Sequence, residues 1–190
     1  MSTTIKVLYI PVGIPGCGKT TFWNDRVKKE FPKAIRISPD DIRRKHLNSE
    51  VTKVFFDWDI EPQVWEESYD LLKYHLKRGY SPIYFDATHL TWRSRWNVSN
   101  FGQKAGYKVI CVHFFIHPKL CFVRNLAREN PVPHDAMVDM LRTYTSPKMP
   151  GDPYIDEIQQ YKLQPTEEER VKMKKISLTD EIKNKKTSCI

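Results

Sequence analysis

Short apolar segments alternate with longer amphipathic segments along most of the chain, and this pattern predicts strands that alternate with helices. The segments that we predict as strands are Ile5–Val12, Ala34–Ile37, Ile83–Asp86 and Val109–Ile116. The last of them is apolar throughout, which is typical of a strand that is buried on both faces. Alternating strands and helices form a parallel sheet with helices on both faces, so the pattern predicts an α/β fold.

Helices are predicted from the spacing of apolar residues and from residues that start or stop a helix. Asn48–Trp58 carries apolar residues at the spacing of one helical face, and Gly79 is a helix stop. Ser38 and Pro39, followed by two aspartates, predict a helix start. The predicted helices are Gly18–Lys29, a helix from Ser38, Asn48–Trp58, Glu61–Lys77, Trp92–Ala105, Pro118–Glu129 and Asp135–Tyr144.

The composition changes after Lys162, where charged residues dominate. Thr166 and Glu169 have the spacing of a capping box, which predicts a short charged helix. Residues 183–190 are predicted to be disordered. We therefore expect one domain over residues 1–162 and a charged, partly disordered C-terminal appendage over residues 163–190.

The composition is that of a globular protein, and its net positive charge favours a polyanionic partner. The chain has 190 residues, of which 40% are hydrophobic and 28% are charged, enough for one domain with a full core. The formal net charge is +8. This balance favours nucleic acid, a membrane surface or a phosphorylated metabolite as partner, and the alternative is a basic surface that is simply solvated.

The cellular compartment is indicated by the lack of a targeting pattern and by the spacing of the cysteines. No segment approaches the length of a membrane span, and Met1–Thr4 leads into the first strand without a signal-peptide pattern. The 4 cysteines are scattered, without the C-x-x-C pair of a zinc or redox site, which fits a reducing compartment. We therefore expect an intracellular protein, cytoplasmic or nuclear, with no membrane partner.

Residues 13–20 form a complete GxxxxGK[ST] phosphate-binding loop between the first strand and the first helix. The bare glycine backbone lets N–H groups point at phosphate oxygens, and the following helix adds the positive end of its dipole. Lys19 would reach the β- and γ-phosphates of ATP, and the Thr20 hydroxyl would bind Mg²⁺. The nucleotide-binding residues predicted in this loop are Gly13, Pro15, Gly16, Cys17, Gly18, Lys19, Thr20 and Thr21.

Cys17 lies at a free position of this loop, beside Lys19 and the N-terminus of a helix. That setting could lower the pKa of the thiol and make it oxidisable. The alternative is that Cys17 is only a small residue that fits the loop.

Three of the predicted strands lead at their carboxyl ends into polar segments, which are Gly13–Thr20, Ser38–Arg43 and Asp86–Arg95. Ligands of open parallel sheets gather at the carboxyl ends of the strands, so these segments should converge on one crevice. Asp86 ends a strand, where an acid can support Mg²⁺ or its water shell. Thr88 and His89 could contact the acceptor or metal-bound water, and His89 is alternatively a turn residue.

Asp40 and Arg43 lie three residues apart on one predicted helical face. An acid beside a cation, next to a triphosphate site, suits a base that takes a hydroxyl proton while the arginine holds a phosphate of the acceptor. The alternative for Asp40 and Asp41 is that acids in the first turn of a helix favour its dipole.

Two further segments carry arginines that could contact phosphates. Arg124 and Arg128 are four residues apart in a predicted helix, a pairing that favours an anion over that face, and the proline-rich break that follows would let the segment act as a lid. The sequence from Trp92 to Trp96 interleaves aromatic residues with Arg93 and Arg95, which suits stacking on bases while phosphates are held. The alternatives are two solvated arginines in the first case and packing onto the sheet for each tryptophan.

Four motifs together resemble the polynucleotide 5′-hydroxyl kinase family, whose type member is a bacteriophage enzyme. They are Gly13–Thr20, Ser38–Arg43, Phe85–Leu90 and Arg124–Arg128, and their order and spacing match over roughly residues 5–145. With this resemblance we expect a P-loop three-layer sandwich. Its four-stranded parallel sheet would have the order 2-3-1-4, and it would carry an arginine-bearing lid.

The resemblance also implies roles for individual residues. Asp40 would be the general base, Arg43 would bind the phosphate of the acceptor, and Arg128 would stabilise the transferring phosphoryl group from the lid. Asp86 matches the acid of a family element in which His89 replaces the usual asparagine. The predicted sets are catalytic Lys19, Asp40 and Arg128; acceptor-binding Asp40, Arg43, Asp86, Thr88, His89, Arg93 and Arg95; metal-binding Thr20 and Asp86; with Arg124 and Arg128 also binding ATP.

We therefore expect an ATP- and Mg²⁺-dependent kinase that transfers the γ-phosphate to the 5′-hydroxyl end of RNA or DNA, as in the healing or repair of nucleic acid ends. Two alternatives remain open. One is a P-loop kinase of a smaller acceptor, such as a nucleotide, a sugar acid or an aminoacyl-tRNA. The other is a nucleotide-gated binding module that transfers no phosphate.

Overall fold

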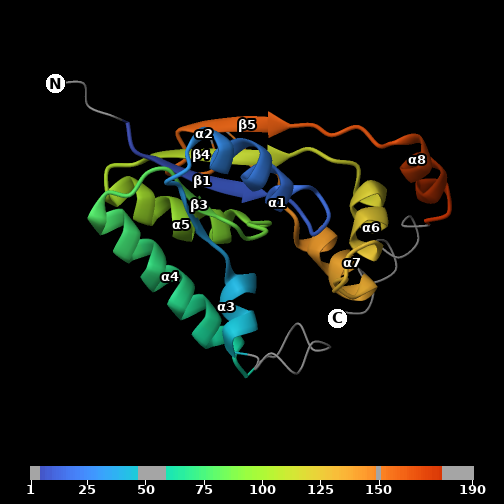
Figure 1. The fold of residues 1–190 in the computed structure, drawn as a ribbon, viewed down its shortest axis with the longest axis horizontal. Coiled ribbons are helices and arrows are strands. Elements are labelled where there is room, and N and C mark those ends of the chain that lie inside the picture. Colours follow the sequence, from blue (N-terminus) through green and yellow to red (C-terminus); the bar gives the residue numbers. More distant parts are fainter. Residues whose placement is uncertain (1–4, 47–58, 149–150, 177–190) are drawn as a thin grey trace.

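The computed structural model describes residues 5–46, 59–148 and 151–176, and its strands form one parallel sheet (Figure 1). The strands are β1 (Val7–Val12), β2 (Ile35–Ile37), β3 (Ile83–Phe85), β4 (Lys108–Phe114) and β5 (Glu157–Tyr161). They lie side by side in the order β2-β3-β1-β4-β5, and each neighbouring pair is parallel. The α/β fold and the order of the first four strands are confirmed.

The predicted number of four strands is wrong by one, because β5 continues the sheet beyond β4. Its residues pair in register with β4 from Ile110 opposite Glu157 to Phe114 opposite Tyr161. The sequence of β5 is Glu-Ile-Gln-Gln-Tyr, and none of its side chains is fully buried. An edge strand with one mixed face lacks the continuous apolar run by which the other strands were predicted.

The described helical elements follow the predicted order along the chain. They are α1 (Lys19–Phe22), η1 (Trp23–Val27), α2 (Lys28–Glu30), α3 (Pro39–His46), α4 (Glu61–Arg78), α5 (Trp92–Lys104), α6 (Pro118–Leu126), α7 (His134–Thr143) and α8 (Glu167–Lys174). The first predicted helix is therefore continuous from Lys19 to Glu30, with a π-helical turn in its middle. The predicted helix Asn48–Trp58 and the predicted disorder of residues 183–190 lie outside the described residues.

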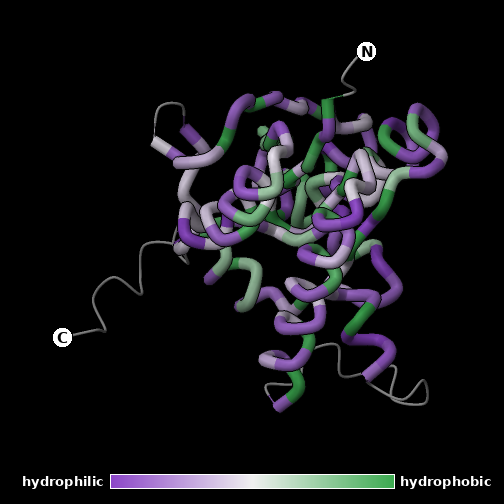
Figure 2. Tube along the Cα trace, turned by 90° about the vertical axis from the view of Figure 1, so that its left-hand side faces the viewer, coloured by the Kyte–Doolittle hydropathy of each residue, from purple (hydrophilic) through white to green (hydrophobic). Residues whose placement is uncertain are grey.

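Side chains on the two faces of the central strands pack against different helices. Leu8, Ile10 and Val12 of β1 point to the face that buries Leu72 of α4 and Val98 of α5. On the opposite face, Tyr84 of β3 packs against Trp23 and Val27 of η1, as the alternation of side chains along a strand requires. Hydrophobic segments gather toward the middle of the molecule and hydrophilic ones lie outside, which Figure 2 shows.

The carboxyl ends of the strands face the helices that follow β4 and β5. In Figure 1 the arrowheads of β1 and β5 point to the side where α6, α7 and α8 lie. The predicted capping box of α8 is confirmed, since Thr166 and Glu169 each bond to the backbone of the other. Helix α8 contacts α6 through an ion pair between Glu169 and Arg124. The division into a domain over 1–162 and an appendage over 163–190 stays a prediction.

None of the helices in the described part of the chain combines the length and the apolar character that crossing a membrane requires.

Candidate functional site

The predicted phosphate-binding loop connects β1 to α1 at the carboxyl edge of the sheet. Gly16 and Gly18 adopt φ angles of 83° and 101°, which only glycine adopts at little cost. A side chain at position 16 would also overlap the backbone carbonyl of Cys121 in α6. The loop is further tied to the β3–α5 segment, because the N–H of Gly13 donates to the carbonyl oxygen of Thr88 at 3.0 Å.

Lys19 folds back over this loop. Its Nζ donates to the carbonyl oxygens of Gly13 at 2.8 Å and Ile14 at 3.1 Å. The carbonyl of Lys19 itself accepts from the Tyr84 hydroxyl at 3.0 Å, which fixes the start of α1 to β3. Thr20 and Thr21 are exposed on the first turn of the helix. The binding of phosphates by Lys19 and of Mg²⁺ by the Thr20 hydroxyl stays a prediction.

Cys17 is 1% exposed. Burial raises the pKa of its thiol, and the neighbouring Lys19 opposes this shift only in part. The expectation of a lowered pKa and a reactive thiolate is therefore wrong, because the loop encloses the sulfur instead of presenting it to solvent. The alternative, a small residue that fits the loop, is favoured.

Asp40 is held by a buried arginine. Arg43 donates from Nη1 to Oδ1 of Asp40 at 2.6 Å and from Nη2 to Oε2 of Glu61 at 3.0 Å. Burial alone would lower the pKa of the Arg43 guanidinium, but its bonds to Glu61 and Asp40 raise it. Arg43 and Glu61 are both buried, whereas the Asp40 side chain is 45% exposed. Asp40 is thus held by a buried arginine, while part of its own side chain stays open to solvent.

This geometry bears on the predicted role of Arg43. Its guanidinium is 5% exposed and spans Glu61 at the start of α4 and Asp40 at the start of α3. Such a placement favours positioning of Asp40 over direct contact with the acceptor. The contact between Arg43 and a phosphate of the acceptor stays a prediction. Glu61 was missed, because an acid in the first turn of a helix is commonplace.

Replacing Glu61 with Gln is expected to lower kcat by about 10-fold or more, because Asp40 would lose a fixed orientation. The KM for ATP should change little, since Glu61 does not face the phosphate loop. Steady-state kinetics with ATP and the acceptor would measure both constants. Glu66→Gln, an exposed position on the same helix, is the matched control. Equal kcat values for the two variants would contradict this role.

Asp86 directly follows β3, at the end where the sequence predicts an acid. It is buried, and it pairs with Arg36, whose Nε donates to Asp86 Oδ2 at 2.8 Å. Burial raises the pKa of this carboxyl, Arg36 and Lys19 lower it, and Asp40 raises it further. The charges of Lys19 and Asp40 thus both act on this buried acid. That the phosphate loop and the candidate base form one site stays a prediction.

The metal-binding prediction for Thr20 and Asp86 is compatible with this arrangement but stays a prediction. Oδ1 of Asp86 has no hydrogen-bond partner among the residues that the structure describes, whereas Oδ2 is taken by Arg36. No cluster of three or more His, Cys, Asp or Glu side chains suited to a metal occurs in the described ranges. Such a donor set fits Mg²⁺, which is usually held by one or two protein oxygens together with the phosphates of its nucleotide.

Arg36 is a second residue that sequence reasoning missed. It donates to Asp86 and, from Nη1, to Oδ2 of Asp41 at 2.6 Å. Asp41 also binds Arg44. The two acids of the first turn of α3 therefore have different partners: Asp41 serves this network, and Asp40 is bound by Arg43. A charge within the apolar run Ala34–Ile37 was the signal available in the sequence.

His89 is a buried turn residue. Its φ angle is 46°, and its Nε2 lies 3.1 Å from the carbonyl oxygen of Phe85. Burial lowers the pKa of the imidazole to about 4, and the bond to Phe85 only partly offsets this. The ring is therefore neutral near pH 7 and directed at the backbone, which favours the turn interpretation over contact with the acceptor. Thr88, by contrast, is partly exposed beside the loop.

Replacing His89 with Asn, which tolerates positive φ, is expected to flatten the pH dependence of stability. The pKa falls from 6.5 to about 4 on folding, so the unfolded state binds the proton first. Stability contributed by His89 is therefore complete above pH 6.5 and is lost toward pH 4, by about 1.4 kcal/mol per pH unit at most. Urea denaturation at several pH values would measure this. Parallel curves for the parent and the variant would contradict it.

The two arginines of the Trp92–Trp96 motif are in opposite environments. Arg93 is exposed, as predicted for a residue that contacts an acceptor. Arg95 is 1% exposed. Its guanidinium donates hydrogen bonds to the carboxylate of Asp152 and to the carbonyl oxygens of His89, Leu90 and Thr145. The prediction that Arg95 binds the acceptor is therefore wrong, because all of its donors serve the fold.

The predicted lid arginines also differ from each other. Helix α6 ends at Leu126, so the prediction that Arg124 and Arg128 share one helical face is wrong. Arg124 donates from Nε to Oε1 of Glu169 at 2.8 Å, whereas Arg128 is exposed in the turn after the helix. The amide of Asn125 closes this turn, with bonds to the carbonyl oxygen and N–H of Val132. ATP contacts from Arg124 and Arg128 stay predictions.

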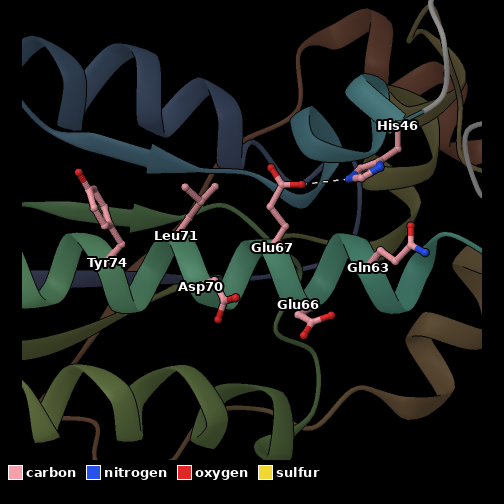
Figure 3. Close-up of a pocket in the computed structure, with 7 residues that line it drawn as sticks. All are labelled: His46, Gln63, Glu66, Glu67, Asp70, Leu71 and Tyr74. Carbon is pink, nitrogen blue, oxygen red and sulfur yellow. Dashed lines mark hydrogen bonds and ion pairs between the residues drawn. The ribbon is translucent and has the colours of Figure 1, made fainter.

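An open groove along α4 offers a second candidate site, and its charge excludes it for phosphates. Its lining residues are His46, Gln63, Glu66, Glu67, Asp70, Leu71 and Tyr74, which Figure 3 shows. Glu67 points toward His46 and bonds to it at 3.0 Å. Three carboxylates in one groove repel a polyanion. The phosphate loop is therefore the better candidate.

Comparisons with known proteins agree with the fold. A family model described as an AAA domain matches residues 8–147. A fungal RNA kinase is similar in structure, with a TM-score of 0.63 and 21% identity, over 92% of this chain and 84% of that chain. The PezAT toxin–antitoxin system of Streptococcus pneumoniae gives a TM-score of 0.65 and 20% identity, over 85% of this chain and 69% of that chain.

A sugar kinase from Janibacter sp. is also similar, with a TM-score of 0.59 and 17% identity, over 90% of this chain and 92% of that chain. No curated protein matches the chain by sequence. At identities this low, the structural likeness establishes the P-loop kinase fold and leaves the acceptor open.

Proposed function

Because the chain belongs to the family of AAA domains, we propose that it is an ATP-dependent kinase that phosphorylates the 5′-hydroxyl end of RNA or DNA. The observation that carries this proposal is the carboxylate of Asp40, which accepts a hydrogen bond from Arg43, while Arg43 is itself held by Glu61. Asp40 follows β2 and the phosphate loop follows β1, so both lie at the carboxyl edge of the same parallel sheet. A nucleotide switch needs no such base beside its phosphate site, whereas a kinase of hydroxyl groups does.

The residues of the site would divide the work of an in-line transfer. Lys19 and the backbone of the loop would bind the phosphates of ATP. Thr20 would hold Mg²⁺, which neutralises phosphate charge when it is bound. Arg128, exposed after α6, would approach the γ-phosphate from the lid.

Asp40 would take the proton of the acceptor. One of its oxygens, Oδ1, accepts from Arg43, and Oδ2 has no hydrogen-bond partner among the described residues. As the hydroxyl oxygen forms its bond to the γ-phosphorus, the bond from that phosphorus to the β-phosphate oxygen breaks. The hydroxyl proton passes to Oδ2, and ADP leaves.

The polynucleotide is favoured as acceptor by charge and by one neighbour. The chain carries a formal net charge of +8, which suits a polyanion. A fungal RNA kinase is among the similar structures. The similarity to a sugar kinase keeps a small hydroxyl acceptor as the second candidate.

One labelling experiment separates these candidates. The chain would be incubated with γ-labelled ATP and a panel of 5′-hydroxyl RNA, 5′-hydroxyl DNA, mononucleotides and simple sugars. We expect the 5′ end of an oligonucleotide to become labelled, and we expect no labelling when EDTA removes Mg²⁺ from the reaction. Label on a sugar or mononucleotide alone would replace the proposal with the second candidate. Release of inorganic phosphate without any labelled acceptor would overturn both.

A further inference from the structure

Three large aromatic side chains are exposed on α5 and on the segment that is bonded to it. Trp92 and Trp96 of α5 are 55% and 37% exposed, and Tyr154 of the segment after α7 is 47% exposed. For Trp92 and Trp96 the alternative of packing onto the sheet is disfavoured, because core aromatic residues are enclosed and these two side chains are exposed. We call Trp92, Arg93, Trp96, Lys148 and Tyr154 the aromatic surface. Exposed aromatic groups gathered in this way mark a binding site more often than chance exposure does.

The aromatic surface is rigidly built. The capping box of Thr91 and Ser94 fixes the start of α5, and the N–H of Trp92 donates to Thr145 Oγ1 at 3.0 Å. Trp96 lies one helical turn beyond Trp92 on the same face. A backbone that is held in place before a ligand arrives loses little entropy when its side chains bind that ligand.

The segment that carries Tyr154 is pinned to the same helix. Arg95 binds Asp152 through both carboxylate oxygens, and Ser99 Oγ donates to the carbonyl oxygen of Pro153 at 3.2 Å. Ser99 lies seven residues after Trp92, on the helical face of both tryptophans. Tyr154 directly follows Pro153, so it lies beside α5, near the part of the helix that follows Trp96.

The charge of the aromatic surface indicates the class of ligand. Arg93 and Lys148 are exposed, and neither forms an ion pair within the part of the chain that the structure describes. The nearest acid of the segment, Asp152, is neutralised by Arg95. Cations interleaved with flat aromatic faces suit single-stranded nucleic acid, whose bases stack while its phosphates meet the cations.

The aromatic surface is continuous with the proposed acceptor site. The segment from Asp86 to Thr91 leads from the carboxyl end of β3 directly into α5. The carbonyl oxygen of Thr88 binds the phosphate loop, and that of Leu90 accepts from the N–H of Thr145 at 2.8 Å. A strand whose 5′ end lay beside Asp86 and Asp40 would therefore reach the start of α5 with its following nucleotides.

We propose that the aromatic surface binds the single-stranded segment behind the 5′ end of the acceptor. Bases stack on Trp92, Trp96 and Tyr154, and phosphates contact Arg93 and Lys148. The inference rests on the proposed function, and it adds that the kinase selects unpaired ends and gains affinity with strand length.

The test compares the parent chain with the double variant Trp92→Ala/Trp96→Ala. Fluorescence anisotropy with a labelled single-stranded 12-mer should show a Kd that rises about 10-fold or more in the variant, since each lost stack weakens binding. The KM for a 5′-hydroxyl dinucleotide should stay the same, because it is too short to reach α5. Tyr74→Ala, which removes an equally exposed aromatic group from α4, is the control and should leave both constants unchanged.

Charge is tested separately with Arg93→Gln. The slope of log Kd against log salt should fall by roughly 0.7, as expected for one lost phosphate contact on a single strand. A blunt duplex of the same length should compete weakly with the labelled 12-mer, because its bases are not free to stack.

The outcomes separate the two claims. Unchanged affinity of the tryptophan variant for the 12-mer, or equal competition by the duplex, would overturn the inference while phosphorylation of oligonucleotides still supported the proposed function. Weakened binding in the variant, together with no labelled oligonucleotide for the parent chain, would support the aromatic surface and overturn the proposed function. Circular dichroism would confirm that each variant is folded.

Discussion

Replacing Asp40 with Asn is expected to lower kcat for the transfer to a 5′-hydroxyl oligonucleotide by about 10²–10⁴-fold. The amide keeps the shape of the side chain and can still accept from Arg43, so the local structure should persist. It cannot take a proton from the acceptor. The KM for ATP should change little, because the phosphates are bound by the loop around Lys19.

The matched control for this prediction is Asp41→Asn. Asp41 is the next residue in the same helical turn, but both oxygens of its carboxylate are bound, by Arg36 and by Arg44. We expect its kcat to fall by less than about 10-fold. Rates would be measured with saturating ATP and oligonucleotide. An Asp40→Asn variant with the kcat of the parent would show that Asp40 is not the base. So would an Asp41→Asn variant whose kcat is lower than that of Asp40→Asn.

The parts of the fold that the sequence predicted are those that local patterns determine. Four strands are short and mostly apolar, and the phosphate loop needs its glycines at fixed positions, so both could be identified without coordinates. Strand β5 could not, because its polar residues are stabilised by pairing with β4 at an edge. The end of α6 at Leu126 is likewise decided by tertiary bonds, in which the amide of Asn125 closes the turn at Val132.

The candidate site was predicted in its motifs but not in its environments. A sequence names Arg43, Arg93 and Arg95 as equivalent cations, and burial alone separates them: Arg95 is enclosed, Arg43 supports an acid, and Arg93 is exposed. Burial also decides the case of Cys17. Its neighbours in the sequence suggested a lowered pKa of the thiol, whereas burial in the structure raises that pKa. Long-range partners such as Glu61 decide these environments, and no local pattern records them.

Removal of Asp152 is expected to have the largest effect on stability. Asp152 and Arg95 form a bidentate ion pair with side chains that are 4% and 1% exposed. The variant Asp152→Ala would leave a charged guanidinium buried without its counterion. Breaking a buried pair in this way costs about 3–5 kcal/mol. Urea or thermal denaturation would measure the loss, and Glu168→Ala, which removes an exposed carboxylate from α8, should change stability by less than about 1 kcal/mol.

The cost of losing Asp152 should extend to the acceptor site, because Arg95 does more than balance a charge. The same guanidinium holds the carbonyl oxygens of His89 and Leu90, next to Thr88, which binds Gly13 of the phosphate loop. Below its unfolding temperature, Asp152→Ala should therefore raise the KM for the oligonucleotide more than the KM for ATP. The double variant Arg95→Met/Asp152→Leu removes both charges but leaves the buried carbonyl of His89 without its donor, so it should recover only part of the stability. Full recovery would show that Arg95 matters only as a counterion, and an Asp152→Ala variant as stable as the parent would contradict the prediction outright.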